Sequence, residues 1–98
     1  MVHVYKGDKV KLPCHVTPTT ATNVTWLQRV RPRSRFYDIY INDEIYQRLR
    51  HRFSIYNSTV GDYSLNISEI WPPDAGHYLC FNQQQLIKEY FVNVSGSY

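Results

Sequence analysis

The chain has 98 residues, enough for one domain with a buried core and too few for a second. Hydrophobic residues make up 43% of it and aromatic residues 15%, which excludes a disordered segment, and nine Tyr against one Met favour strands over helices. The net charge of +3 does not by itself predict a nucleic-acid partner, because such a partner requires a basic patch.

Cysteines and glycosylation signals indicate the compartment. Cys14 and Cys80 lie far apart, in a spacing that fits neither a zinc site nor a redox C-x-x-C motif, so a long-loop disulfide is left. Closing a loop of that length contributes about 4 kcal/mol to stability. N-x-S/T sequons, which are acceptors for N-linked glycans, begin at Asn23, Asn57, Asn66 and Asn93. This density of sequons beside a disulfide predicts an extracellular origin.

The sequence contains neither a signal peptide nor a run of about 18 apolar residues. We interpret Met1 as an expression start and expect any leader, stalk and membrane anchor to lie outside the sequence. The expected location is therefore the extracellular side of the plasma membrane, with a secreted form as the alternative.

The first elements show the two-residue alternation of strands. Residues 2–5 alternate and are followed by a turn at 6–9. In residues 10–16 apolar and polar side chains alternate, so that Cys14 faces inward. His15 lies on the opposite face and is interpreted as a solvated surface residue, because no second metal ligand lies nearby at a useful spacing.

A Thr-rich loop at 17–23 leads to a strand at 24–28, on which Trp26 faces inward. Residues 29–35 then place four arginines at alternate positions around a Pro-Ser turn. A solvated hairpin tip and a partner-binding loop explain this pattern equally well.

The middle of the chain continues with strands. Residues 36–41 alternate as a strand, residues 42–44 turn the chain, and a further short strand is expected at 45–49. Another strand begins at 52–54, and a polar hairpin at 57–61 leads to a strand at 63–68. On that last strand Asn66 points to solvent, and the inward residues are Tyr63, Leu65 and Ile67.

Residues 74–80 form a D-x-G-x-Y-x-C run, which predicts a turn that feeds a strand. Tyr78 and Cys80 lie two apart and therefore share one face of that strand. A short hairpin at 81–87 and a strand at 88–94 complete the chain.

The D-x-G-x-Y-x-C run, the position of Trp26 twelve residues after Cys14, and the segment from Arg52 to Cys80 together resemble a variable-type (V-set) domain of the immunoglobulin superfamily. The resemblance implies one all-β domain over residues 1–98, a two-sheet Greek-key sandwich with the inter-sheet disulfide Cys14–Cys80. It also implies that Trp26 packs on the disulfide, that the Tyr78 hydroxyl binds the corner backbone, and that Arg52 pairs with Asp74.

The interval between Trp26 and Arg52 has room for the extra C′ and C″ strands that distinguish variable from constant domains. One feature departs from antigen receptors: no glycine lies between Gly76 and Gly96, whereas rearranged receptors carry F-G-x-G in strand G. The resemblance therefore implies an unrearranged domain. The classes it implies are T-cell co-receptor alpha chains, costimulatory and checkpoint ligands and receptors, novel immune-type receptors, and adhesion molecules.

Strand parity predicts an apolar face on the sheet that the family labels G-F-C-C′-C″. With Tyr37, Ile39 and Ile41 taken to fill the core, aromatic and aliphatic side chains, Leu79 among them, converge outside and are rimmed by arginine. The alternative is that part of this set belongs to the core. The predicted partner-binding residues on this face and its hairpin are Leu27, Arg29, Arg33, Phe36, Tyr40, Phe81, Gln83, Gln84, Gln85, Leu86 and Phe91.

The first hypothesis is the ligand-recognition domain of a cell-surface immune receptor or co-receptor, which binds a protein through this face as a monomer or a homodimer. The alternative is a homophilic cell-adhesion module. An enzyme is not expected, because Asp38, Asp43, Glu44 and the histidines form no recognisable nucleophile–base arrangement. No metal, cofactor, small-molecule substrate or nucleic acid is predicted as a partner.

Overall fold

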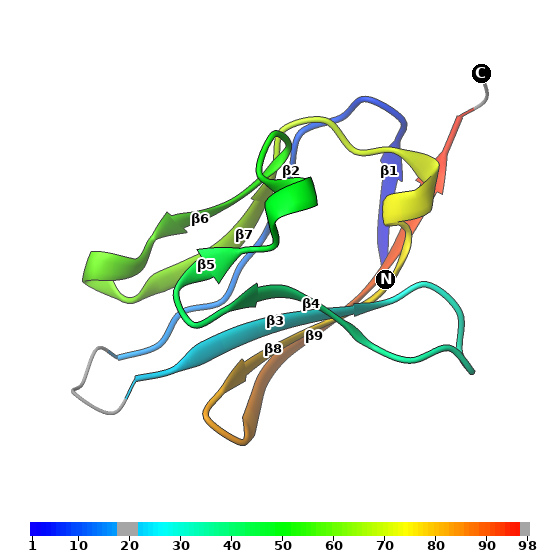
Figure 1. Ribbon diagram of the computed structural model, residues 1–98. Coiled ribbons are helices and arrows are strands. Elements are labelled where there is room, and N and C mark those ends of the chain that lie inside the picture. The colour runs from blue at the N-terminus through cyan, green and yellow to red at the C-terminus, as the bar shows by residue number, and fades with distance from the viewer. Residues whose placement is uncertain (18–21, 97–98) are drawn as a thin grey trace.

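A computed structural model describes residues 1–17 and 22–96, which form two β-sheets packed face to face (Figure 1). In the larger sheet β1 is parallel to β9 and the other neighbours are antiparallel. The six strands of this sheet lie side by side in the order β1 (Val2–Tyr5), β9 (Gln85–Ser95), β8 (Gly76–Asn82), β3 (Val24–Arg29), β4 (Tyr37–Ile41) and β5 (Glu44–Ile45).

The smaller sheet is antiparallel and has the order β2 (Val10–Leu12), β7 (Asp62–Ile67) and β6 (Phe53–Asn57). The described ranges also contain three short 3-10 helices, η1 (Gln47–Leu49), η2 (Ser58–Val60) and η3 (Pro72–Asp74). No helix within these ranges is long and apolar enough to cross a membrane.

The core lies between the two sheets and is built on the disulfide. Cys14 and Cys80 are bonded, which confirms the predicted bridge and the two-sheet all-β sandwich. Trp26 is fully buried, its Nε1 donates a 2.7 Å hydrogen bond to the Tyr63 carbonyl, and its ring stacks on Tyr90 at 6.2 Å. The Trp26 indole N–H therefore has a partner inside an apolar core, as a buried polar group requires.

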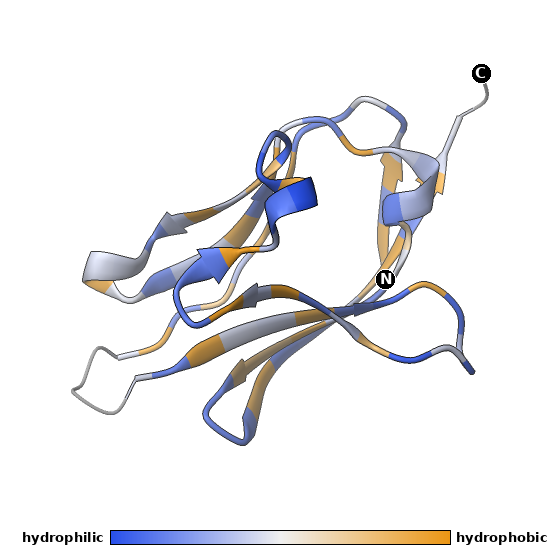
Figure 2. Cartoon of the chain, viewed as in Figure 1, coloured by the Kyte–Doolittle hydropathy of each residue, from blue (hydrophilic) through white to orange (hydrophobic). Residues whose placement is uncertain are grey.

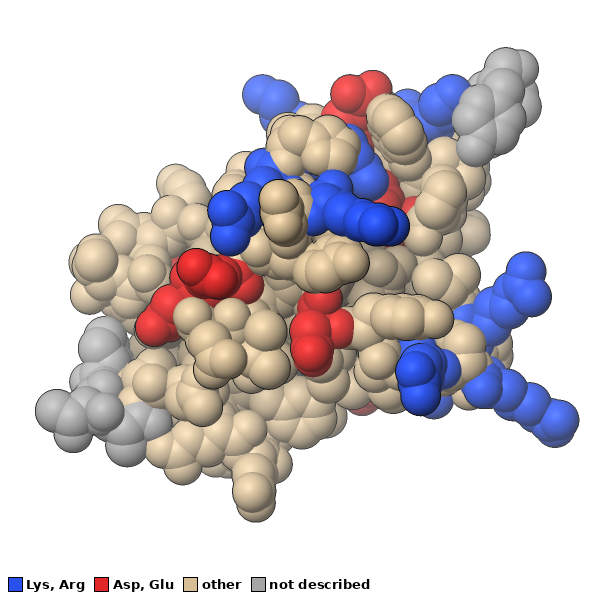
Figure 3. Space-filling model, viewed as in Figure 1, with Lys and Arg blue, Asp and Glu red and all other residues tan. Residues whose placement is uncertain are grey.

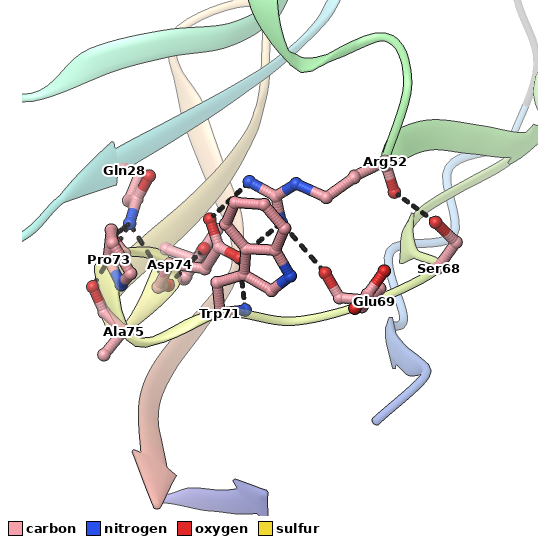
Figure 4. A network of polar contacts seen from close by, with 9 residues as sticks. Gln28, Arg52, Ser68, Glu69, Trp71, Pro73, Asp74 and Ala75 are labelled. Carbon is pink, nitrogen blue, oxygen red and sulfur yellow. Dashed lines mark hydrogen bonds and ion pairs between the residues drawn. The ribbon is translucent and has the colours of Figure 1, made fainter. Parts of the chain in front are cut away.

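The corner between β7 and β8 is fixed by one carboxylate, that of Asp74. Arg52 donates to both its oxygens, with Nη1 to Oδ2 at 2.5 Å and Nη2 to Oδ1 at 3.1 Å, and Trp71 N donates to Oδ2 at 2.7 Å (Figure 4). The Tyr78 hydroxyl donates to the Asp74 carbonyl. Burial raises the pKa of Tyr78 well above its usual range, so that the hydroxyl remains a donor. The structure thus contains the Arg52–Asp74 and Tyr78 contacts that the resemblance implies.

Gly76 lets β8 begin directly against β3. Its φ is +136°, and a Cβ at this position would collide with the carbonyl oxygen of Arg29. Gln28 holds the same corner from β3, because its Nε2 donates to the carbonyls of Asp74 and Ala75 at 3.1 Å each (Figure 4). These contacts fix the first residue of β8, the strand that carries Tyr78 and Cys80, against β3.

The strand expected over 10–16 is shorter than predicted. β2 ends at Leu12, because Pro13 has no N–H with which to continue the ladder. Pairing with β7 resumes beyond the proline, where Tyr63 N donates to the Cys14 carbonyl at 2.8 Å. The inward parity of Cys14 is kept across this gap.

The strand expected at 45–49 is wrong. Only Glu44–Ile45 pairs with β4, and Gln47–Leu49 forms η1. Ile45 and Leu49 both pack on the core while Gln47 is exposed. A strand through Leu49 would place Gln47 on the core face with the other two, whereas the 3-10 turn moves Gln47 out to solvent and returns Leu49 to the core.

Candidate interaction face

The side of the large sheet that faces away from the small one carries apolar side chains. In the register of β3 with β8, Thr25 opposes Phe81, Leu27 opposes Leu79 and Arg29 opposes His77. The residues between them, Trp26, Tyr78 and Cys80, are fully buried in the core. Leu27, Leu79 and Phe81 therefore point to the opposite side, as the sequence predicts.

We call this surface the outer face and define it by Leu27, Phe36, Leu79, Phe81, Leu86 and Phe91. Leu86 is opposite Phe81 in the ladder and 44% exposed, and Phe91 is opposite His77 and 49% exposed. Figure 2 shows hydrophobic segments along β3, β8 and β9, the strands that carry most of this surface.

Leu79 shows that the outer face is a packed patch and not a set of scattered residues. It is only 9% exposed, yet it is not a member of the core cluster between the sheets. Its neighbours in the ladder are Leu27 on β3 and Glu89 on β9. Side chains of the outer face must therefore cover Leu79, and contiguous apolar surface of this kind marks an interaction site.

His77 organises one end of the outer face. Its ring stacks on Phe91 at 4.3 Å and meets the edge of Phe36 at 5.5 Å. Its Nε2 lies 2.5 Å from Glu89 Oε1, and its Nδ1 lies 3.2 Å from Arg29 Nη2. Because arginine only donates, we assign Nδ1 as the acceptor and Nε2–H as the donor to Glu89. The contacts of His77 therefore connect β3, β8, β9 and the segment before β4 at this end of the face.

The Arg29 side chain packs on this end of the outer face and does not extend into solvent. Its guanidinium carbon lies 4.5 Å from the centre of the Phe36 ring, a cation–π distance. Arg33, by contrast, is exposed in the turn beyond the strands and has no ion pair with any described residue. The structure therefore places Arg29 on the outer face and Arg33 beyond its end.

The prediction that Tyr40 points outward is wrong. It is 5% exposed and packs in the core near Tyr63, with ring centres 6.3 Å apart. Opposite it, β3 steps directly from Trp26 to Leu27 while β4 steps from Tyr40 to Asp38, so Ile39 is an extra residue. This bulge turns both Ile39 and Tyr40 inward. Burial and the carboxylate of Asp43 raise the pKa of Tyr40 to about 12.

Two other core assignments are also wrong: the bulge turns Ile41 outward, whereas Tyr37, opposite Gln28 at the first residue of β4, keeps its parity but is not covered by the core. Tyr37 and Ile41, which the alternation places in the core, are 56% and 41% exposed. Ile39 is buried, as expected. Asp38 lies opposite Leu27 on the outer face, so this edge of the apolar patch is acidic.

The hairpin between β8 and β9 carries the predicted glutamines at one end of the sheet. Gln83, Gln84 and Gln85 are exposed, and Gln83 has a φ of +58°, a left-handed conformation that a glutamine rarely adopts. Gln83 N donates to the Asn23 carbonyl at 2.8 Å, and Asn23 N donates to the Asn82 side chain at 3.0 Å. One backbone–backbone and one backbone–side-chain hydrogen bond thus fix the hairpin against the start of β3.

The sequon asparagines are all exposed and are distributed over the surface. Asn23 lies beside the β8–β9 hairpin, and Asn57 ends β6. Asn66 is on the solvent side of β7, as predicted, and Asn93 lies on β9, two residues beyond Phe91. Each side chain is accessible to a glycan, and glycosylation stays a prediction.

Sequence reasoning missed the roles of His77 and Glu89. His77 has the same parity as Leu79 and Phe81 in the sequence. That parity was a usable signal for its place on the face. The contact with Glu89 depends on the register of β8 with β9, which no local pattern reports.

Among the described residues, no group of three or more His, Cys, Asp or Glu could hold a metal ion.

Comparison with known proteins agrees with this architecture. The family model for the immunoglobulin V-set domain matches residues 1–95. No curated protein matches the chain. A similar solved structure is the monoclinic crystal form of the ZIG-8–RIG-5 IG1–IG1 heterodimer, with a TM-score of 0.73, 18% identity, and coverage of 97% of this chain and 81% of that chain. That identity supports the fold alone, whereas the family model spans nearly the whole sequence: the chain belongs to the immunoglobulin V-set family.

Proposed function

We propose that this domain is the extracellular recognition module of a cell-surface immune receptor or co-receptor, and that it binds a protein partner through the outer face. V-set domains are typically extracellular, non-enzymatic binding modules. The observation that carries the proposal is the aromatic and aliphatic patch on the solvent side of the large sheet. No described residue forms a second layer over that patch.

The composition of the outer face fits a protein interface. Interface centres are enriched in aromatic residues and depleted of charge, and their rims are polar. Here Leu27 and Phe81 on the middle strands are the central anchors, and at one end of the face Arg29 is held over Phe36. The exposed glutamines of the β8–β9 hairpin supply a polar rim at the other end of the sheet.

The assignment to immune receptors rests on the sequence. The absence of glycine between Gly76 and Gly96 separates the chain from rearranged antigen receptors, and the four sequons support an extracellular glycoprotein. In the ZIG-8–RIG-5 structure the immunoglobulin domains form a heterodimer, which supports testing this domain for a protein partner.

Binding to a panel of purified immunoglobulin-domain ectodomains tests the proposal. We expect the wild-type domain to bind at least one of them, and Phe81→Glu to weaken that binding at least about tenfold, because a charge is buried at an interface centre. Val60→Glu is the matched control, because Val60 is 66% exposed in η2, away from the outer face. Equal weakening by both variants, or no binding to any ectodomain, contradicts the proposal.

The homophilic alternative makes a different prediction for the same variants. If the outer face joins two copies of this chain, sedimentation of the wild-type domain shows a dimer that Phe81→Glu dissociates and Val60→Glu does not. A monomer at every concentration, together with binding to another ectodomain, excludes homophilic adhesion and leaves the receptor proposal in place.

A further inference from the structure

The turn between β3 and β4 concentrates positive charge. Four of the 11 Lys and Arg residues of the chain lie in the stretch 29–35, and no Asp or Glu occurs anywhere from residue 9 to residue 37. Arg29 is folded onto the outer face, whereas Arg31, Arg33 and Arg35 are exposed. In Figure 3, Lys and Arg side chains project from the end of the molecule where this turn lies in Figure 1.

The turn that presents these three arginines is well defined. Ser34 N donates to the Arg31 carbonyl at 3.0 Å, Arg31 N donates to Ser34 Oγ at 3.1 Å, and Ser34 Oγ donates back to the Arg31 carbonyl at 2.9 Å. Pro32 fixes the backbone at the second position of the turn. The backbone that carries the charges is therefore already ordered before any ligand binds, which lowers the entropy lost on binding.

Some other basic side chains of the domain lie near a carboxylate, whereas among the described residues the three exposed arginines of the turn do not. Arg52 pairs with Asp74, and Lys11 and Arg50 lie 3.9 and 4.0 Å from carboxylates. Arg31, Arg33 and Arg35 have no such contact with any described residue. Three like charges on one short turn repel one another, and a ligand of high negative charge density relieves that repulsion.

A pocket adjoins the turn. It has a volume of about 380 Å³ and lies between the turn and the ends of β8 and β9. Arg29 and Arg31 line one side, and Phe91 and Asn93 line the other. Guanidinium groups and an aromatic ring around one hollow can hold the anionic group and the ring face of a charged sugar.

We propose that the turn at residues 30–35 and this pocket bind a sulfated glycosaminoglycan chain. Guanidinium groups recognise the oxygens of a tetrahedral anion in bidentate fashion, and a sulfated polysaccharide offers such groups at regular intervals along a flexible chain. An acidic protein would have to place a carboxylate against each of three arginines on a protruding turn. The pocket borders the outer face at Arg29 and Phe91, but Arg31, Arg33 and Arg35 lie beyond the end of that face, so the site can be tested separately from the proposed protein-binding function.

Binding of the intact domain to immobilised heparin tests the site. We expect binding that weakens with salt, and we expect the triple variant Arg31→Gln, Arg33→Gln, Arg35→Gln to lose at least about tenfold in affinity at about 0.15 M salt. The slope of log affinity against log salt should fall by about one unit for each arginine removed. The matched control is Lys9→Gln, Arg48→Gln, Lys88→Gln, which removes the same charge from exposed positions outside the turn and should keep most of the affinity and slope.

Equal losses in the two triple variants would show that heparin senses only net charge and would overturn the proposal, as would no heparin binding at low salt. Hyaluronan, which carries carboxylates without sulfate, should bind at least about tenfold more weakly than heparin. Polyglutamate that binds as tightly as heparin, with the same loss in the turn variant, would assign the site to an acidic protein instead. Phe81→Glu should leave heparin binding nearly unchanged, so failure here and failure of the proposed function are distinguishable.

Discussion

The outward side of the small sheet is polar and that of the large sheet is apolar, although the strands of both sheets alternate inward and outward residues in the same way. On the small sheet the outward residues of β7 are Asp62, Ser64 and Asn66, and polar contacts within the sheet satisfy the first two. On the large sheet the outward residues of β8 include Leu79 and Phe81, and no second layer formed by described residues covers them. The polar groups of one face are paired within the sheet, whereas the apolar side chains of the other face remain at the surface; we propose that a partner covers them.

The polar network of the small sheet shows how its face is completed. Asp62 Oδ1 accepts from Ser64 N at 3.1 Å and from Ser64 Oγ at 2.5 Å, and Ser64 Oγ accepts from Cys14 N at 3.2 Å. Lys11 lies 3.9 Å from the same carboxylate and 4.0 Å above the Tyr56 ring. Asp62 and Ser64 are buried, which requires that their polar atoms be paired. Substitutions here should therefore change stability, whereas those on the outer face should change binding.

The largest expected effect comes from the backbone that supports the outer face. Gly76→Ala forces a Cβ against the Arg29 carbonyl and should destabilise the domain by about 3 kcal/mol or more, measured by chemical denaturation. Gly7→Ala is the control, because Gly7 also has a positive φ, +93°, but no atom within 4 Å of the added Cβ. It should lose only about 1 kcal/mol. Equal losses would show that the close approach of β8 to β3 is unimportant.

The next effect concerns the network of the small sheet. Asp62→Ala leaves both donors of Ser64 without their acceptor in a buried position and should destabilise the domain by about 2 kcal/mol. Partner binding by the folded fraction should stay unchanged, because the outer face lies on the other sheet. Thermal denaturation and the ectodomain panel measure the two quantities. Lost binding with unchanged stability would reverse the roles assigned to the two faces.

Acid should weaken the small sheet by the same route. The hydrogen bonds from Ser64 hold the pKa of Asp62 below its ordinary value, with help from His15 and Lys11 and against the effect of burial. A lowered pKa in the folded state gives stability that is complete above the unfolded pKa of about 4 and is lost as pH falls through the folded pKa. The stability difference between the wild type and Asp62→Asn should therefore shrink below about pH 4. A difference that stays constant down to pH 2 contradicts this account.

The smallest stability effect is expected on the outer face. Phe81→Ser removes an aromatic ring that is already partly in water, so its free energy of unfolding should change by less than about 1 kcal/mol. Phe53→Ser is the contrasting variant, because Phe53 is 2% exposed in the core, and it should lose several times more. A large loss from Phe81→Ser would mean that the outer face is held together for stability.

The framework of the fold was predictable because it rests on local patterns and on one covalent bond. Cys14, Trp26 and Cys80 show their inward parity directly in the sequence, and Arg52 and Asp74 occupy positions that the family resemblance identifies. The inward and outward positions of a strand can be recognised from the alternation of apolar and polar residues alone. The positions of Leu27, Leu79 and Phe81 on the outer face followed from the same reasoning.

What escaped prediction depends on pairing between strands. The extra residue Ile39 turns Tyr40 into the core, and a bulge of one residue leaves no mark in the local pattern. The helical turn at 47–49 replaces the expected strand and leaves Gln47 exposed while Ile45 and Leu49 reach the core. The His77 cluster joins residues from four separate segments, so it appears only when the register is known.

The claim that the outer face binds a protein is tested most directly by methyl NMR of the wild-type domain, titrated with an ectodomain that it binds. We expect shifts and broadening of the Leu27, Leu79 and Leu86 methyl signals on the large sheet. Signals of Ile55 and Val60, on and beside the small sheet, should remain unchanged. Perturbation confined to Ile55 and Val60, with Leu27, Leu79 and Leu86 unaffected, would contradict it.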